Sequence, residues 1–215
     1  MEKISYAKTV YGQDEIDAVV KCLNESTQMG NYSRKFESKI AKLFDKDFCL
    51  YVNSGSSALY IGVESFNFPE GSEVITPALT FGTTISCLIK NKLIPVFVDV
   101  EPLSYCIDTT QIEEMITDKT VAILAPNLMG NICNWEKISE ISKKHGLIVI
   151  EDSADTLGGT INGKSSGYYS DMSITSFYGS HIINCAGNGG SISINDEGVY
   201  KKSLLLRSWG RSSSL

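Results

Sequence analysis

Hydrophobic residues recur at two different spacings along the chain, and these spacings predict the order of its elements. Residues 12–25 carry apolar side chains at helical intervals, and residues 32–44 repeat the pattern. Beyond them, short apolar runs of strand length alternate with further helical patterns. Strands are predicted at 48–52, 73–76, 95–98, 120–125 and 147–151, and helices at 56–66, 83–90, 108–117 and 134–145. This alternation is typical of an α/β fold with a mostly parallel sheet and helices on both faces.

The pattern changes after Asp152, where several glycines interrupt the helical spacing. Residues 161–164 read as a tight hairpin turn, and two further strands are predicted at 171–178 and 190–194. A last helix is expected at 196–207, with Asn195-Asp196 as its cap. Neither an internal repeat nor a linker interrupts residues 1–215, which we therefore expect to form a single domain.

Composition and charge narrow the class of protein. The chain has 215 residues, 42% of them apolar, and a formal net charge of −6. These values are typical of a globular chain and argue against disorder and against electrostatic binding of nucleic acid. No apolar run approaches the ~20 residues of a membrane-spanning helix, and the N-terminus has no signal-peptide core. The six scattered cysteines predict buried free thiols in a reducing cytoplasm, and two histidines give little support for a zinc site.

Four segments follow predicted strands, where ligands of open α/β sheets bind. The first, at 53–58, has small residues and hydroxyls at a helix start, which suit a phosphate but also a well-capped turn. In the second, at 77–83, Phe81 could stack on a planar ring or pack in the core. In the third, at 151–155, Asp152 could hold a protonated ring nitrogen or cap a helix.

The fourth segment, at 176–183, ends in a loop with His181 and is followed by Gly187-Asn188-Gly189-Gly190. A histidine in such a loop could act as a general base, although a lone histidine is more often structural.

Taken in order, the four segments resemble the DegT/DnrJ/EryC1/StrS family of pyridoxal-phosphate sugar aminotransferases over residues 7–211. The motifs that carry the resemblance are Ser54-Gly55-Ser56, Pro77-Ala78-Leu79-Thr80-Phe81, Glu151-Asp152-Ser153-Ala154, Ser176-Phe177 and Gly187-Asn188-Gly189-Gly190. The resemblance implies the large domain of a fold-type-I pyridoxal-phosphate-dependent transferase, with a seven-stranded, mostly parallel sheet. Since members of the family are about twice as long, it also implies that residues 1–215 are the cofactor-binding part of a larger enzyme.

The resemblance also assigns roles to individual residues. Gly55, Ser56 and Ser176 match positions that bind the cofactor phosphate, and Phe81 matches the aromatic residue that stacks on its ring. Asp152 matches the carboxylate that pairs with the pyridinium nitrogen. Asp155 stands near the ring's 3-hydroxyl, where most members have Gln or His, and is therefore a departure from the family pattern.

The main departure is His181, which stands where the aminotransferases have the lysine of the internal Schiff base. No lysine lies between Lys164 and Lys201. An imidazole cannot form a Schiff base but can move a proton. The change resembles the nucleotide-sugar 3-dehydratases, which use pyridoxamine phosphate. By resemblance, the cofactor amine condenses with the 4-keto group of a nucleotide-linked 4-keto-6-deoxyhexose, and His181 removes the C4′ proton as the C3 hydroxyl leaves.

One branch of these dehydratases binds an iron–sulfur cluster through cysteines. The matching positions here are Ala154 and residues 212–214, which are serines, so neither a cluster nor another metal is predicted. The other branch regenerates the amine cofactor from glutamate. The resemblance further implies a homodimer with a shared active site and a role in deoxysugar and surface-glycan biosynthesis, such as that of lipopolysaccharide O-antigen. The alternatives are an aminotransferase that works without this lysine, and a non-catalytic cofactor- or sugar-binding regulator.

Overall fold

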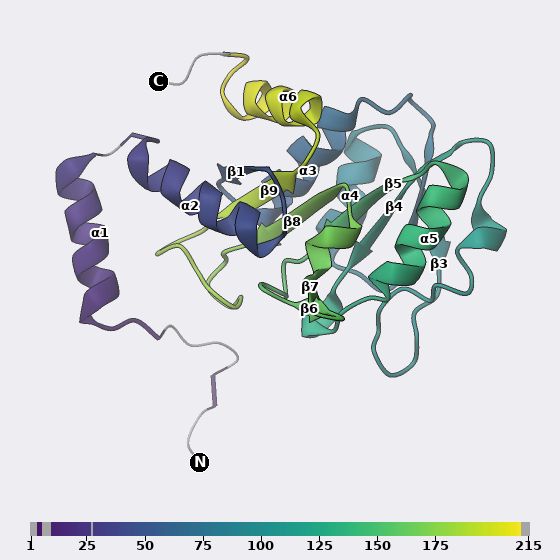
Figure 1. Cartoon of the computed structure of the whole chain (residues 1–215), viewed down its shortest axis with the longest axis horizontal. Coiled ribbons are helices and arrows are strands. Elements are labelled where there is room, and N and C mark those ends of the chain that lie inside the picture. The colour runs from purple at the N-terminus through teal and green to yellow at the C-terminus, as the bar shows by residue number, and fades with distance from the viewer. Residues whose placement is uncertain (1–3, 6–9, 27, 212–215) are drawn as a thin grey trace.

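A seven-stranded mixed sheet lies at the centre of the computed structural model, which describes residues 4–5, 10–26 and 28–211 (Figure 1). The sheet strands are β1 (Phe48–Val52), β2 (Glu73–Pro77), β3 (Ile94–Val98), β4 (Thr120–Pro126), β5 (Ile148–Asp152), β8 (Met172–Ser176) and β9 (Gly190–Ile194). The α-helices are α1 (Gln13–Glu25), α2 (Asn31–Leu43), α3 (Gly55–Phe66), α4 (Gly82–Lys90), α5 (Trp135–His145) and α6 (Glu197–Arg207). Short elements complete the chain: η1 (Glu113–Met115), η2 (Leu128–Gly130), η3 (Ser166–Tyr169), and the strands β6 (Thr160–Ile161) and β7 (Lys164–Ser165).

The strand order is β1-β9-β8-β5-β4-β2-β3. The neighbours from β8 to β3 are parallel, whereas β9 is antiparallel to both β8 and β1. It follows that β1 runs in the same direction as the parallel strands. The carboxyl ends of β1, β2, β4, β5 and β8 therefore lie at one edge of the sheet, and β9 begins at that edge. The predicted mostly parallel sheet is confirmed.

Helices cover both faces of the sheet (Figure 1). On one face, α3 and α4 pack on alternate residues of the strands in a core that includes Val63, Leu88 and Ile150. On the other face, α5 inserts Trp135 and Ile138, and α2 covers the β1 side of the sheet in a smaller core. Because successive residues of a strand point to opposite faces, β5 supplies Ile150 to the first core and Val149 to the second. The near-continuous apolar strands of the sequence are explained by this burial on both sides.

The predicted helix at 108–117 is wrong. The chain forms a turn at Asp108, whose carboxylate accepts hydrogen bonds from the backbone amide and hydroxyl of Thr110 and the side chain of Gln111. Only the three residues of η1 are helical in this stretch. An aspartate that binds the amide two residues on competes with helix formation, so the local side chain overrides the apolar spacing.

Two local predictions of the glycine-rich segment are confirmed. Strands β6 and β7 form the hairpin, and Asn162 and Gly163 at its tip have φ angles of 50° and 78°. Both angles are positive, as a two-residue turn of this kind requires. The side chain of Asp196 caps α6 by accepting the amide of Val199 at 2.8 Å.

Helix α1 has an apolar side, but none of its residues is buried. The residues predicted to share one face, Ile16, Val19, Val20 and Leu23, are between 42% and 62% exposed. Figure 1 shows α1 standing apart from the sheet and its covering helices. Within the described ranges, no helix is both long enough and apolar enough to span a membrane.

The six cysteines are free thiols. The prediction that they are buried is correct for Cys49, Cys87, Cys106 and Cys133, whereas Cys22 and Cys185 are only half-buried.

The start of β9 depends on a glycine, and this generates a prediction for stability. A Cβ at Gly190 would overlap the backbone of Ser54 and Gly55, which cannot move without displacing the start of α3. We expect Gly190→Ala to lower the free energy of unfolding by about 1–3 kcal/mol, the usual cost of overpacking. Urea denaturation measures this change.

The matched control is Gly82→Ala, because Gly82 is the first residue of α4 and has open space around its Cβ position. It should change the unfolding free energy by less than about 1 kcal/mol. Equal losses in the two variants would contradict the close approach at Gly190.

Candidate active site

The four segments singled out in the sequence meet at the carboxyl edge of the sheet. Asp152 and Ser176 are the last residues of β5 and β8. The turn at Ser54 follows β1, and the segment with Phe81 follows β2. The topology of the sheet thus brings together residues that are more than 100 positions apart in the sequence. This is expected of a mostly parallel sheet, because the carboxyl ends of its strands lie at the same edge.

The first turn of α3 is packed tightly against the end of β8. Ser54 caps the helix by accepting the amide of Ser57 at 3.0 Å. A Cβ at Gly55 would lie 2.7 Å from the Cβ of Ser176, so only glycine lets the two segments approach this closely. The hydroxyl oxygen of Ser176 accepts the amide of Tyr178 at 3.4 Å, which leaves its O–H able to donate. Amides in the first turn of a helix have no intrahelical partner, so this corner can bind an anion.

The second segment contributes a hydroxyl and an aromatic ring. The hydroxyls of Ser56 and Thr83 lie 3.1 Å apart, which joins the starts of α3 and α4. Phe81 precedes α4 and is 72% exposed. The alternative that Phe81 packs in the core is therefore wrong, and its ring is accessible at the same edge as the anion-binding corner.

Asp152 is a buried carboxylate with two hydrogen bonds. Its side chain accepts the hydroxyl of Thr84 at 3.1 Å and the amide of Ala154 at 3.1 Å. Burial raises the pKa of Asp152 from 3.8 to about 6, against the lowering effect of both hydrogen bonds. A carboxylate in this state is stabilised by a cation, because a neighbouring positive charge removes part of the cost of burial.

Asp155 and His181, the two residues that by resemblance depart from the family pattern, lie beside each other. Nε2 of His181 is 3.7 Å from Oδ1 of Asp155, and the other oxygen of Asp155 accepts the amide of Met129 at 2.9 Å. Nδ1 of His181 is buried and has no hydrogen-bond partner within the described part of the chain. The ring of Tyr178 meets the imidazole edge to face, with centroids 5.9 Å apart. An imidazole held in this way can take up a proton.

Sequence reasoning missed two contributors to the site. Thr84 holds Asp152 from the first turn of α4, and its place one residue beyond the Phe81 segment is a signal that could have found it. Met129 holds Asp155 through its backbone amide, from a turn in which its φ is 56°. A contact made by a main-chain amide leaves no trace in the residue type, so no sequence signal identifies Met129.

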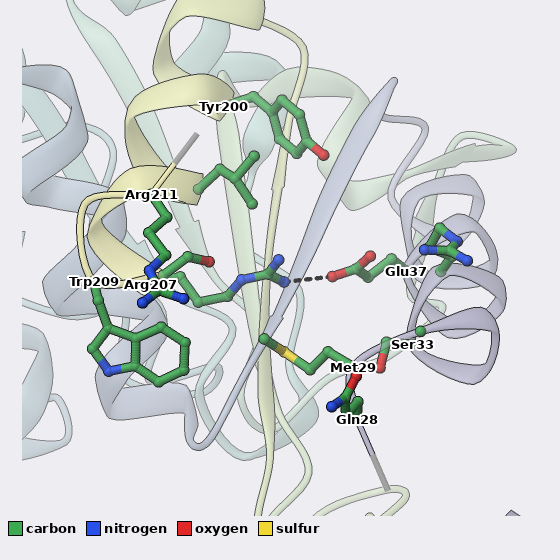
Figure 2. A pocket seen from close by; sticks show the side chains of 12 residues that line it. Gln28, Met29, Ser33, Glu37, Tyr200, Arg207, Trp209 and Arg211 are labelled. Atoms are coloured by element: carbon green, nitrogen blue, oxygen red, sulfur yellow. Dashed lines mark hydrogen bonds and ion pairs between the residues drawn. The ribbon is translucent and has the colours of Figure 1, made fainter. Parts of the chain in front are cut away.

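A separate pocket of about 370 Å³ lies between α2 and α6. Figure 2 shows Arg207 reaching across it to Glu37, with an ion-pair distance of 2.7 Å, and Trp209 and Met29 beside this pair. None of the predicted site residues lines this pocket. The Arg207–Glu37 pair thus joins the two helices away from the strand-end site.

Removing the buried charge of Asp152 should stabilise the cofactor-free chain above pH 6. Because its pKa is about 6 in the folded chain and about 3.9 in an unfolded one, the folded chain binds more protons between these values. The unfolding free energy should therefore fall as the pH rises from about 4 to about 6. Allowing about 1 kcal/mol for a lost hydrogen bond, we expect Asp152→Asn to raise it by about 2 kcal/mol at pH 8 and to lower it by up to about 1 kcal/mol at pH 4.

Urea denaturation at both pH values measures this difference. Asp196→Asn is the control, because Asp196 is an exposed cap whose role Asn can take over. A uniform destabilisation of the Asp152 variant at both pH values would contradict the cost of burying its charge.

Comparison with known proteins identifies the family. The sequence profile of the DegT/DnrJ/EryC1/StrS aminotransferase family matches residues 10–214. GDP-perosamine synthase of Caulobacter vibrioides is 33% identical over 212 residues, which are 98% of this chain and 57% of that protein. GDP-4-keto-6-deoxy-D-mannose 3-dehydratase of Escherichia coli O55:H7 is 34% identical over 194 residues, which are 87% of this chain and 50% of that protein.

A crystal structure of GDP-4-keto-6-deoxymannose-3-dehydratase with a trapped PLP-glutamate geminal diamine superposes with a TM-score of 0.91 at 31% identity. The match covers 97% of this chain and 55% of that one. The chain spans about half the length of the curated relatives it matches. Its sheet and helices are those of the pyridoxal-phosphate-dependent transferases, as predicted. The chain belongs to the DegT/DnrJ/EryC1/StrS aminotransferase family.

Proposed function

We propose that this chain is the cofactor-binding part of a pyridoxamine-phosphate-dependent enzyme that dehydrates a nucleotide-linked 4-keto-6-deoxyhexose at C3. Both relatives described above are named for nucleotide-linked sugars, and one of them is a 3-dehydratase. The observation that carries the proposal is His181, an imidazole at the position that, by resemblance, corresponds to the lysine of the family's aminotransferases.

The residues of the strand-end site fit the phosphorylated pyridine cofactor. Asp152 is buried with a raised pKa, and a protonated ring nitrogen would supply the cation that this carboxylate lacks. The corner formed by Gly55, Ser56 and Ser176 offers amides and hydroxyls to the phosphate. The exposed ring of Phe81 is free to stack on the pyridine.

The chain's residues have distinct roles in the proposed reaction. When bound, the cofactor supplies an amino group that can condense with a keto group and a ring that accepts electron density. Asp152 holds the proton on the ring nitrogen, which keeps the ring electron-poor. His181 takes up the proton whose removal allows the C3 hydroxyl to leave, and the imidazolium can return it to the departing hydroxyl. The water that forms takes its hydroxyl from the sugar and its hydrogen from the cofactor, which also supplies two electrons, so the 3-deoxy-4-keto sugar released by hydrolysis has lost one oxygen atom.

The lysines nearest in sequence to His181 are engaged elsewhere. Nζ of Lys164 lies 3.6 Å from the centroid of the Tyr168 ring, and Lys201 pairs with Glu197 at 2.7 Å on α6. The buried Lys46 donates to the carbonyls of Gly167 and Ser170. Lys46 precedes β1, so it lies at the opposite edge of the sheet from the site. These contacts favour proton transfer by His181 over a lysine-linked reaction.

The second candidate is a nucleotide-sugar aminotransferase, which is favoured by the similarity to GDP-perosamine synthase. The two candidates share the cofactor and the substrate class and differ in whether a lysine bonds to the cofactor. Position 181 therefore separates them.

The wider proposal follows the dehydratase branch without an iron–sulfur cluster. Ala154 and residues 212–214 lack sulfur, and the three serines lie outside the described residues. Among the described residues, no group of His, Cys, Asp and Glu is arranged to hold a metal ion. We propose glutamate as the amino donor, a homodimer as the complete enzyme and the cytoplasm as its location. The geminal diamine trapped in the related dehydratase structure contains glutamate.

The proposed reaction predicts a 3-deoxy-4-keto product that is lighter than its substrate by one oxygen atom. The purified protein is incubated with pyridoxamine phosphate and 4-keto-6-deoxyhexoses linked to different nucleotides, and the sugars are analysed by mass spectrometry. We expect dehydration that falls by a factor of about 10²–10⁴ in His181→Asn, the usual contribution of a general base.

His145→Asn is the matched control, because His145 is the other histidine and pairs at 3.0 Å with Glu113 on the surface. It should leave turnover unchanged. The proposal would be overturned by the absence of a dehydrated product with every substrate tested, or by equal losses in the two variants.

The competing aminotransferase predicts a lysine bonded to the cofactor. We expect pyridoxal phosphate and borohydride to modify no lysine of the site in the natural sequence, but to modify residue 181 in His181→Lys. Peptide mapping by mass spectrometry locates the modified residue. A stoichiometric cofactor-modified lysine in the natural sequence would favour the aminotransferase instead.

A further inference from the structure

Asp155 and His181 come from different loops and are paired at one end of the site. Both differ from the family pattern, and Nε2 of His181 faces Oδ1 of Asp155 at 3.7 Å. We propose that Asp155 is the positioning residue of His181: its carboxylate keeps the imidazole proton on Nε2, so that Nδ1 is the atom that takes up a proton in the reaction. This inference rests on the proposed function for the reaction, but the tautomer is a property of the chain itself.

The carboxylate of Asp155 is held from the side away from His181. Its Oδ2 accepts the amide of Met129 at 2.9 Å, and Met129 lies in the η2 turn. The turn is fixed to the end of β5, since the amide of Asn127 donates to the carbonyl of Asp152 and the Asn127 carbonyl accepts the hydroxyl of Thr156. Because one oxygen is engaged by Met129, the other is left to face the imidazole.

The chemistry of the two groups determines where the imidazole proton lies. A carboxylate only accepts hydrogen bonds, whereas a neutral imidazole has one donor and one acceptor nitrogen. The nitrogen that faces Asp155 is therefore the protonated one. The distance of 3.7 Å exceeds a hydrogen bond by about 0.5 Å, so the preference is electrostatic and strengthens as the two groups approach.

The described environment of Nδ1 places no competing partner against this assignment. Nδ1 is buried and has no partner among the described residues, although buried polar atoms are nearly always hydrogen-bonded. An acceptor left in this way is energetically unfavourable, and a proton donor from a ligand would offset that cost. When Nδ1 takes up a proton, the resulting imidazolium faces the negative charge of Asp155. Asp155 would thus both direct the proton to Nδ1 and stabilise the charge that follows.

The tautomer can be measured directly, because the chain contains only two histidines. The chain is labelled with ¹⁵N-histidine, and long-range ¹H–¹⁵N correlation spectra are recorded at a pH at which both rings are neutral. We expect the Nε2–H tautomer of His181 in the natural sequence. A dominant Nδ1–H tautomer would overturn the proposal without any variant.

The substitution Asp155→Asn should reverse the tautomer preference of His181. The Met129 amide requires the oxygen of the new side chain, so the NH₂ group turns toward His181 and donates to Nε2. We expect the proton of His181 to move to Nδ1, with the His145 signals unchanged. Glu113→Gln is the matched control and should alter only the His145 signals. An unchanged tautomer of His181 in a folded Asp155→Asn protein would overturn the proposal.

Kinetics provides the second measurement. In protein that dehydrates its substrate, Asp155→Asn should lower kcat by a factor of about 10²–10⁴ with little change in KM, the signature of a base held in the wrong tautomer. An unchanged kcat would overturn the positioning role. If the natural sequence shows no turnover, the proposed function fails while the tautomer experiment still tests the Asp155–His181 pair.

Discussion

The burial of a carboxylate at the end of β5 is the constraint on which the site depends. Asp152 is placed there by a strand that is covered on both faces, so its charge lies at the boundary between the core and the cofactor edge. Two hydrogen bonds do not offset the loss of water, which is why its pKa rises to about 6. The chain retains an energetic cost that a bound cation would remove, and in the proposed function that cation is the protonated nitrogen of the cofactor ring.

Glu151, which precedes Asp152, is a buried carboxylate whose oxygens are hydrogen-bonded. Glu151 is also buried, but its oxygens accept three hydrogen bonds, from Asn127 at 2.9 Å and from Ser153 and Ser173 at 2.6 Å each. As consecutive strand residues, Glu151 and Asp152 point to opposite faces of the sheet. One carboxylate is therefore structural and completes a polar network, while the other remains partly unpaired and is available to a ligand.

The fold could be predicted from the sequence because strands that are buried on both faces are apolar at nearly every position. The sequence shows such short apolar runs, and they indicate a sheet covered by helices on both sides. The helix at 108–117 failed because Asp108 binds the backbone locally, a competition that apolar spacing does not record. The strand-end residues were predictable, since topology brings strand ends together. The contact between Asp155 and His181 was not, because it depends on a loop held by the amide of Met129.

The two departures from the family pattern have a common physical explanation. A lysine at position 181 would bond to the cofactor through its amine and would need no partner to orient it. An imidazole can only transfer a proton, and its efficiency depends on which nitrogen carries the lone pair. Replacing lysine by histidine therefore creates a requirement for an acceptor at the far nitrogen. In the proposed arrangement Asp155 meets that requirement, whereas the amide of a Gln could donate to the same nitrogen and reverse the tautomer. Under this proposal the two positions act as one functional unit.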